Sequence, residues 1–233
     1  MGDGGLFLFI YGGCVFRVRE GVQPPKAGSI FFARHLDVRE GEEVLDLGTG
    51  MGLTAVLAAR VAKRVIATDI VPECVTLARE NAVLNGVADR VEARVGDWYG
   101  PVRGMTFDVI ASNPPQMPTP PGLDREDWMA RADNGGVDGW AMLDRIIRGA
   151  PEHLKPGGRL IFSIFDFLGV RRAHDELMAV GLTPSIVARE TQSFPRLGYE
   201  RLDHIRSLDA EGTVPKDGWP KTVERVMVCG RKA

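Results

Sequence analysis

The sequence predicts an α/β fold in which a mostly parallel, seven-stranded sheet is doubly wound, with helices on both faces. Three observations support this. Short apolar runs alternate with longer segments of helical character, and a glycine-rich turn follows an early run. Hydrophobic residues make up 44% and charged residues 26% of the 233 residues, as in ordinary globular domains. Such alternation predicts a parallel sheet because parallel strands need crossover connections, which are usually helices.

The N-terminal elements follow from short apolar runs and the turns between them. Leu6–Ile10 and Cys14–Val18 flank Tyr11-Gly12-Gly13, a pattern typical of a small hairpin. Ser29–Leu36 is expected to form a helix with an aromatic face. The alternation from which the main sheet is predicted begins after this helix.

Seven strands and four helices are predicted in the alternating part of the chain. Pro72 stands in the first turn of one helix, where its missing N–H costs nothing, and Gly181 ends another. The segment from Lys155 to Gly158 ends the longest helix. The predicted strands are Val44–Leu47, Arg64–Thr68, Arg90–Val95, Phe107–Ser112, Arg159–Phe165, Thr183–Arg189 and Val223–Cys229. The predicted helices are Leu53–Val61, Pro72–Leu84, Asp138–Leu154 and Val170–Val180.

Two long stretches interrupt the alternation, Pro114–Val137 and Gln192–Thr222. Long loops are often functional, although a tolerated surface insertion is an equal alternative for the second. Within that second stretch, Phe194–Arg206 mixes aromatic residues with arginines. It is predicted either to clamp RNA or an acidic peptide, or to form an amphipathic helix with Leu202 and Ile205 in the core and its arginines in solvent.

Charge, hydropathy and cysteine content exclude several classes of protein. With 29 basic and 31 acidic residues, the net charge of −2 gives no overall attraction to nucleic acid or to anionic membranes. No apolar run approaches the roughly 18 residues of a membrane span, so a cytoplasmic protein is expected. The cysteines are far apart in the sequence and are expected to be buried thiols. The histidines have no partner at metal-ligand spacing and are expected on the surface, so no metal site is predicted. These residues are Cys14, Cys74, Cys229, His35, His153, His174 and His204.

The glycine-rich turn from Asp46 to Gly52 follows the first predicted strand of the main sheet. Alternate glycines let the backbone approach a ligand closely, and the helix that follows directs its free N–H groups at the same place. The third glycine is Gly52, whereas the dinucleotide fingerprint would require one at the position of Leu53. An acid before the glycines would repel a pyrophosphate and attract an ammonium group. A nucleotide-dependent oxidoreductase is therefore a disfavoured alternative.

The turn resembles the S-adenosylmethionine loop of class I methyltransferases. The resemblance implies that S-adenosylmethionine is the cofactor, that the loop wraps its methionine and ribose, and that Asp46 faces its cationic end. It also implies that Asp69 accepts both ribose hydroxyls and that Ile70 packs on the adenine. The residues expected to bind the cofactor are Asp46, Gly48, Thr49, Gly50, Gly52, Asp69, Ile70, Asp97, Trp98 and Asn113.

Two of these assignments have structural alternatives. Asp69 stands three residues before Pro72, where an acid can cap the following helix. Asp97 and Trp98, which follow the third strand, resemble the adenine site of the family, in which the acid accepts the exocyclic amine. The alternative for Trp98 is packing at the edge of the core.

The motif Asn113-Pro114-Pro115-Gln116 follows the fourth strand. The prolines hold the preceding carbonyls in place, so the Asn113 side chain and the Pro114 carbonyl can accept both hydrogens of an amino group. This would aim the nitrogen lone pair at an electrophile without proton abstraction. The alternative is a proline-rich turn. The residues expected at the reaction centre are Asn113, Pro114 and Pro115.

This motif resembles the Asn-Pro-Pro-aromatic signature of amino-group methyltransferases. Asp133–Gly139 and the turn from Leu154 to Gly158 further resemble the HemK-like protein-(glutamine-N5) methyltransferases. The resemblance implies methyl transfer to an amide or amino nitrogen, with a protein glutamine as the preferred acceptor. An RNA base (adenine N6 or guanine N2) and a small-molecule amine are the alternatives. Gln116 replaces the family's aromatic residue, which leaves open a non-catalytic partner subunit that keeps the fold.

We expect one methyltransferase domain over residues 1–233. Residues 1–40 would form the N-terminal hairpin and helix, 41–190 the cofactor-binding core, and 191–233 the loop insertion and the last strand. The expected partner is the methyl acceptor, with no membrane partner. Pro24–Ser29 lacks the acids that the family carries before its first strand.

Overall fold

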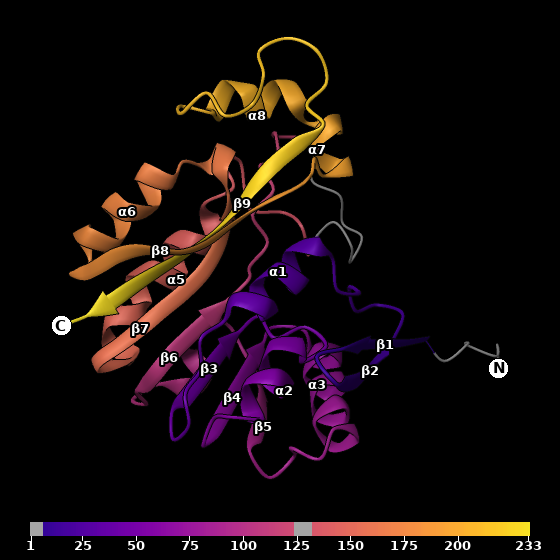
Figure 1. Ribbon diagram of the computed structural model, residues 1–233, viewed down its shortest axis with the longest axis vertical. Coiled ribbons are helices and arrows are strands. Elements are labelled where there is room, and N and C mark those ends of the chain that lie inside the picture. The colour runs from indigo at the N-terminus through magenta and orange to yellow at the C-terminus, as the bar shows by residue number, and fades with distance from the viewer. Residues whose placement is uncertain (1–6, 124–131) are drawn as a thin grey trace.

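A seven-stranded sheet in the order β5-β4-β3-β6-β7-β9-β8 forms the centre of the computed structural model, which describes residues 7–123 and 132–233 (Figure 1). The strand β9 runs antiparallel to both of its neighbours, and the pairs among β3 to β7 are parallel. The predicted doubly wound α/β fold is confirmed. Leu6 of the predicted hairpin and residues 124–131 of the predicted loop lie outside the described residues.

The elements keep the predicted order, and most bounds differ by one to four residues. The strands are β1 (Phe7–Tyr11), β2 (Cys14–Val18), β3 (Glu43–Leu47), β4 (Arg64–Asp69), β5 (Val91–Val95), β6 (Phe107–Ser112), β7 (Leu154–Phe165), β8 (Leu182–Ser193) and β9 (Thr222–Lys232). The helices are α1 (Ala27–His35), α2 (Leu53–Ala59), α3 (Pro72–Leu84), α5 (Ala141–His153), α6 (Val170–Ala179), α7 (Arg196–Glu200) and α8 (Leu202–Leu208). Two short 3₁₀ helices are η1 (Gly100–Val102) and η2 (Asp166–Leu168).

Two hydrophobic cores lie on opposite faces of the sheet. Val44 and Leu45 are neighbours on β3 that point to opposite faces, and both are fully buried because helices cover both sides. The core around Val44 includes Phe31 of α1 and residues of α2 and α3, whereas the core around Leu45 includes Leu143 of α5 and residues of α6. The carboxyl ends of the parallel strands therefore stay uncovered by these helices.

The N-terminal hairpin β1–β2 packs against α3 through two asparagine side chains. The main-chain N–H of Arg17 donates to Asn81 Oδ1 at 2.8 Å, and that of Val15 donates to Asn85 Oδ1 at 2.9 Å. These contacts join the hairpin to the layer of helices that covers β3 and β4.

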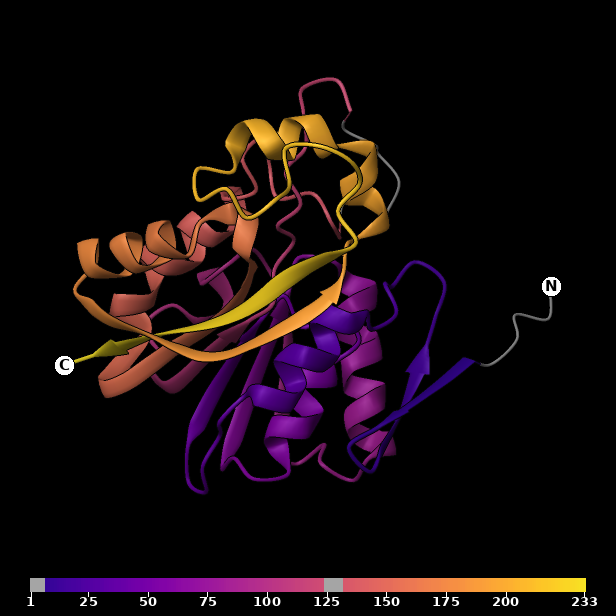
Figure 2. The same cartoon turned by 45° about the horizontal axis from the view of Figure 1, so that its top comes forward.

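The stretch between β8 and β9 folds into α7 and α8, which lie beyond one end of the sheet (Figure 2). As one alternative expected, Leu202 and Ile205 are buried. The expectation that all its arginines are solvated is wrong for Arg201. That side chain is only 4% exposed, because it donates to the Pro118 carbonyl at 3.1 Å and to Thr119 Oγ1 at 2.6 Å.

The expectation of surface histidines is wrong for His153. Its ring is buried, lies stacked on Tyr99 with centroids 4.6 Å apart, and is hydrogen-bonded to the Met105 carbonyl at 2.9 Å. All three cysteines are buried free thiols, as expected. Within residues 7–123 and 132–233, no helix is long and apolar enough to cross a membrane, and no cluster of potential metal ligands is found.

Candidate active site

The glycine-rich turn joins the end of β3 to the start of α2. Gly48, Gly50 and Gly52 have φ values of 75°, 55° and 85°, in the region that favours glycine. A Cβ on Gly52 would lie 2.9 Å from Ala78 Cα, so this glycine also permits close packing against α3. A Cβ on Gly48 or Gly50 would meet no atom within 4 Å. The first two glycines therefore border open space, and the third is needed by the fold.

Asp46 lies inside this turn rather than at its rim. The residue is 2% exposed, and its carboxylate accepts a hydrogen bond of 2.7 Å from Thr49 Oγ1. Burial, and secondarily the nearby negative charge of Asp69, raise the pKa of Asp46 to about 7. The acid that precedes the glycines thus stabilises the shape of the turn, and contact with the cationic end of a cofactor stays a prediction.

Asp69, at the end of β4, links the glycine turn to the start of α3. One carboxylate oxygen accepts from the Gly50 N–H at 2.9 Å and the other accepts from the Val71 N–H at 3.0 Å. Burial raises the pKa of this carboxyl. The second bond closes a local turn just before α3. It is not the helix cap that the structural alternative expected, because the N-cap residue is Val71 and no side chain caps this helix. Beside it, the side chain of Ile70 is 65% exposed and offers an apolar surface at the same edge of the sheet.

Asp97 and Trp98 follow β5 at the same edge. Asp97 is exposed, whereas Trp98 is partly buried and packs against the core that includes α5. Trp98 has a φ of 48°, which is uncommon for a residue other than glycine, and the Arg145 guanidinium lies 5.6 Å from its ring centroid. The edge-packing alternative therefore describes Trp98, and a role beside an adenine stays a prediction.

Asn113 stands immediately after β6, which is the middle strand of the sheet and lies between β3 and β7. Ser163 Oγ, from β7, donates a hydrogen bond of 2.7 Å to Asn113 Oδ1. At the preceding position, Ser112 Oγ donates to the Leu47 carbonyl at 2.8 Å. These two bonds hold the motif at the carboxyl ends of three adjacent strands and orient the Asn113 side chain.

Gln116 points inward, to the backbone of β7. Its side chain is 4% exposed, and Nε2 donates to the Ser163 carbonyl at 3.0 Å and to the Pro114 carbonyl at 3.4 Å. Its Oε1 accepts from the Phe165 N–H at 2.9 Å. The residue that replaces the family's aromatic side chain thus joins the loop after β6 to β7. Pro114 is buried and Pro115 is half-buried in the same loop.

Motif reasoning missed two residues near Asn113, namely Ser163 of β7, which supports it, and Arg225 of β9. Ser163 is a polar residue in the middle of an otherwise apolar run, and Arg225 is a charged residue in another. A polar residue inside a buried strand was the available signal. Pairing of β7 with β9 brings Phe165 opposite Arg225. Phe165 lies two residues after Ser163, which bonds Asn113.

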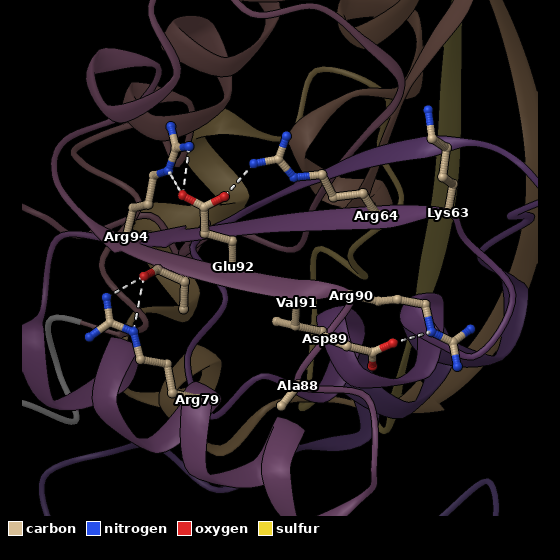
Figure 3. A pocket seen from close by; sticks show the side chains of 10 residues that line it. Lys63, Arg64, Arg79, Ala88, Asp89, Arg90, Val91, Glu92 and Arg94 are labelled. Carbon is tan, nitrogen blue, oxygen red and sulfur yellow. Dashed lines mark hydrogen bonds and ion pairs between the residues drawn. The ribbon is translucent and has the colours of Figure 1, made fainter.

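A hollow far from the glycine turn lies along the edge strand β5 (Figure 3). Arginines and acids on its wall pair with each other: Glu92 with both Arg64 and Arg94, and Arg90 with Asp89. Arg79 donates to a main-chain carbonyl of β5. The charges of this hollow are satisfied internally, and none of the predicted site residues lines it.

Residues 22–119 match the family of the methyltransferase small domain. A protein of Methanocaldococcus jannaschii, named as a proposed protein N5-glutamine methyltransferase, is 33% identical over 79% of this chain and 93% of its own length. The chain belongs to this methyltransferase family. Its members use S-adenosylmethionine as the methyl donor, and the resemblance inferred from the glycine turn and the Asn-Pro-Pro motif is confirmed at the level of the family.

Other relatives cover less of their own length. The release factor glutamine methyltransferase of Cereibacter sphaeroides is 44% identical over 68% of this chain and 59% of that protein, so the chain spans about three-fifths of it. A chain of the E. cuniculi Mtq2–Trm112 complex superposes with a TM-score of 0.62 at 17% identity, covering 91% of this chain and 99% of that one. That likeness shows the shared fold.

Proposed function

We propose that this protein transfers a methyl group from S-adenosylmethionine to the side-chain amide nitrogen of a glutamine in another protein. The observation that carries the proposal is the Asn113-Pro114-Pro115 motif at the carboxyl end of β6, with Asn113 Oδ1 held by Ser163. Relatives named as release factor and ribosomal protein uL3 glutamine methyltransferases favour a protein acceptor. Such an acceptor places the reaction in the cytoplasm.

The residues around the glycine turn fit the cofactor. Gly48 and Gly50 border open space, the Asp69 carboxylate is fixed by two main-chain bonds, and Ile70 exposes an apolar side chain beside it. In our proposal, Asp69 receives the ribose hydroxyls, Ile70 packs on the adenine, and Asp97 accepts the adenine amine. S-adenosylmethionine supplies a methyl group on a sulfonium, whose departure as a neutral thioether needs no acid.

Asn113 and Pro114 would then hold the acceptor amide. A glutamine nitrogen is a weak nucleophile because its lone pair is delocalised into the carbonyl. With both amide hydrogens accepted by Asn113 Oδ1 and the Pro114 carbonyl, the lone pair faces the methyl group, and positioning takes the place of a general base. The bond from Gln116 to the Pro114 carbonyl is long at 3.4 Å, which leaves that oxygen available to an acceptor. The proton leaves to water after the methyl group arrives.

The inward orientation of Gln116 bears on the alternative of a non-catalytic partner subunit. That alternative drew on the loss of the aromatic residue at this position. Gln116 makes hydrogen bonds to two main-chain groups of β7. The presence of glutamine in place of the aromatic residue therefore preserves the loop that presents Asn113. The geometry therefore supports catalysis, with an RNA base or a small amine as the remaining alternative acceptors.

Methyl-labelled S-adenosylmethionine tests the proposal. The purified protein is incubated with an extract of its source cells, and the labelled product is divided between protease and nuclease. We expect protease alone to release the label into small fragments, with peptide mass spectrometry placing it on glutamine. Label that resists protease would contradict a protein acceptor, and sensitivity to nuclease would then identify an RNA base.

A further inference from the structure

Arg225, near the start of β9, is a buried cation for which residues 7–123 and 132–233 supply no hydrogen-bond partner. It is 8% exposed, its Nε is buried and unpartnered, and among the described residues its guanidinium forms no hydrogen bond or ion pair. Burying a cation in this state is costly unless something satisfies it. Burial lowers the pKa of Arg225 to about 9.

The groups around Arg225 fix its position without satisfying its donors. The guanidinium carbon lies 3.6 Å from the centroid of the Phe165 ring, so the plane is supported from one side. On α1, a Cβ at Gly28 would lie 2.7 Å from Nη2, so glycine leaves room for the guanidinium. A guanidinium that stacks on a ring keeps its N–H donors at its edge, where an oxygen can accept them.

The nearby acids are engaged elsewhere. Glu190 pairs with Arg225 in the register of β8 and β9, but its carboxylate binds Arg34 at 2.7 Å. Asp133 raises the pKa of Arg225 through its charge, yet its carboxylate binds Lys26 Nζ at 2.7 Å. Within the part of the chain that the structure describes, the cation therefore keeps unused donors.

The sheet places Arg225 on the acceptor side of the site. It pairs with Phe165, two residues beyond the Ser163 that holds Asn113. The strand β9 lies two positions from β6 in the sheet. Since neighbouring strands are about 4.8 Å apart, the two strands are separated by roughly 10 Å. The strands that carry Asp46 and Asp69 lie on the other side of β6. A ligand oxygen at Arg225 would thus belong to the acceptor rather than to the cofactor.

We propose that Arg225 binds a carbonyl or carboxylate oxygen of the acceptor protein, within about three residues of the methylated glutamine. An extended peptide advances about 3.3 Å per residue, so three residues cover the distance between β6 and β9. Arg225 is then a specificity-determining residue that receives the acceptor chain, while Asn113 receives the amide. This inference rests on the proposed function.

Kinetics with the release factor of the source organism as acceptor test this role. We expect Arg225→Gln to raise KM for the release factor by about 10-fold or more, the effect of losing a charged hydrogen bond. The affinity for S-adenosylhomocysteine should stay unchanged, and Arg225→Lys should recover part of the loss. The matched control is Arg231→Gln on the same strand, because Arg231 donates to the Gly157 carbonyl at the far end of the sheet.

Thermal unfolding separates this role from a structural one. Replacing a buried cation that lacks a partner should leave the Tm of Arg225→Gln unchanged or higher. A lower Tm with an unchanged KM would show that the stack on Phe165 is structural and would overturn the inference. If Arg225→Gln fails to fold, the KM of Arg225→Lys decides. If the wild type is active and neither variant changes the KM, the inference is overturned and the proposed function stands. If the wild type methylates no protein, the proposed function and the inference are overturned together.

Discussion

Gln116→Leu should destabilise the protein by about 2–6 kcal/mol. The substitution keeps a side chain of similar size but removes the partners of the Phe165 N–H and the Ser163 carbonyl, which Gln116 bonds at 2.9 and 3.0 Å. Leaving a buried main-chain group unsatisfied costs about 1–3 kcal/mol, and two such groups give the stated range. For a domain of this size, about 2–4 °C of Tm corresponds to each kcal/mol, so we expect a Tm lower by at least about 4 °C.

The assay is thermal unfolding followed by circular dichroism, with Gln192→Leu as the matched control. Gln192 Nε2 bonds Glu190 at 3.0 Å in a half-exposed position on the edge strand, where water can replace the bond. The control should change stability by less than about 0.5 kcal/mol. Equal Tm values for the two variants would refute the reasoning, because they would show that the Gln116 bonds contribute no more than surface contacts.

Three further predictions concern the loops at the carboxyl edge. Asn113→Ala should keep the affinity for S-adenosylhomocysteine, measured by calorimetry, and lower kcat by about 100-fold or more, since it removes an acceptor of the amide hydrogens; equal losses of both would contradict its role. Because burial raises the pKa of Asp46 from 3.8 to about 7, its ionisation opposes folding and contributes a loss of stability of roughly 4 kcal/mol as pH rises through that interval. In urea denaturation, the fall in stability over that interval should therefore be smaller in Asp46→Asn than in the wild type, and equal falls would contradict the burial of this carboxyl. Gly52→Ala should lower stability by about 1–3 kcal/mol more than Gly48→Ala, because of the two only a Cβ at position 52 meets Ala78. Gly48→Ala should chiefly weaken cofactor binding, and similar Tm values for the two variants would contradict this.

Local signals in the sequence predicted the elements of the fold well. The strand Phe107–Ser112 and the helix Pro72–Leu84 have the predicted bounds, because a turn motif ends the first and a proline begins the second. The long helix begins at Ala141 rather than at Asp138, because the Asp138 carboxylate accepts from the Trp140 N–H just before the helix. The strand β7 begins at Leu154, which pairs with Phe107, so the expected turn is included in the strand.

The sequence by itself determined the glycine-rich turn, the Asn-Pro-Pro motif and the family to which the chain belongs, because each is carried by neighbouring residues. Only the tertiary structure decided what those residues touch. Ser163 lies 50 positions from Asn113 and meets it through the pairing of β6 and β7. Arg225 lies opposite Phe165, two strands from Asn113, because β9 inserts antiparallel between β7 and β8. Strand order depends on the burial of both faces of the sheet at once, and no short run of residues encodes it.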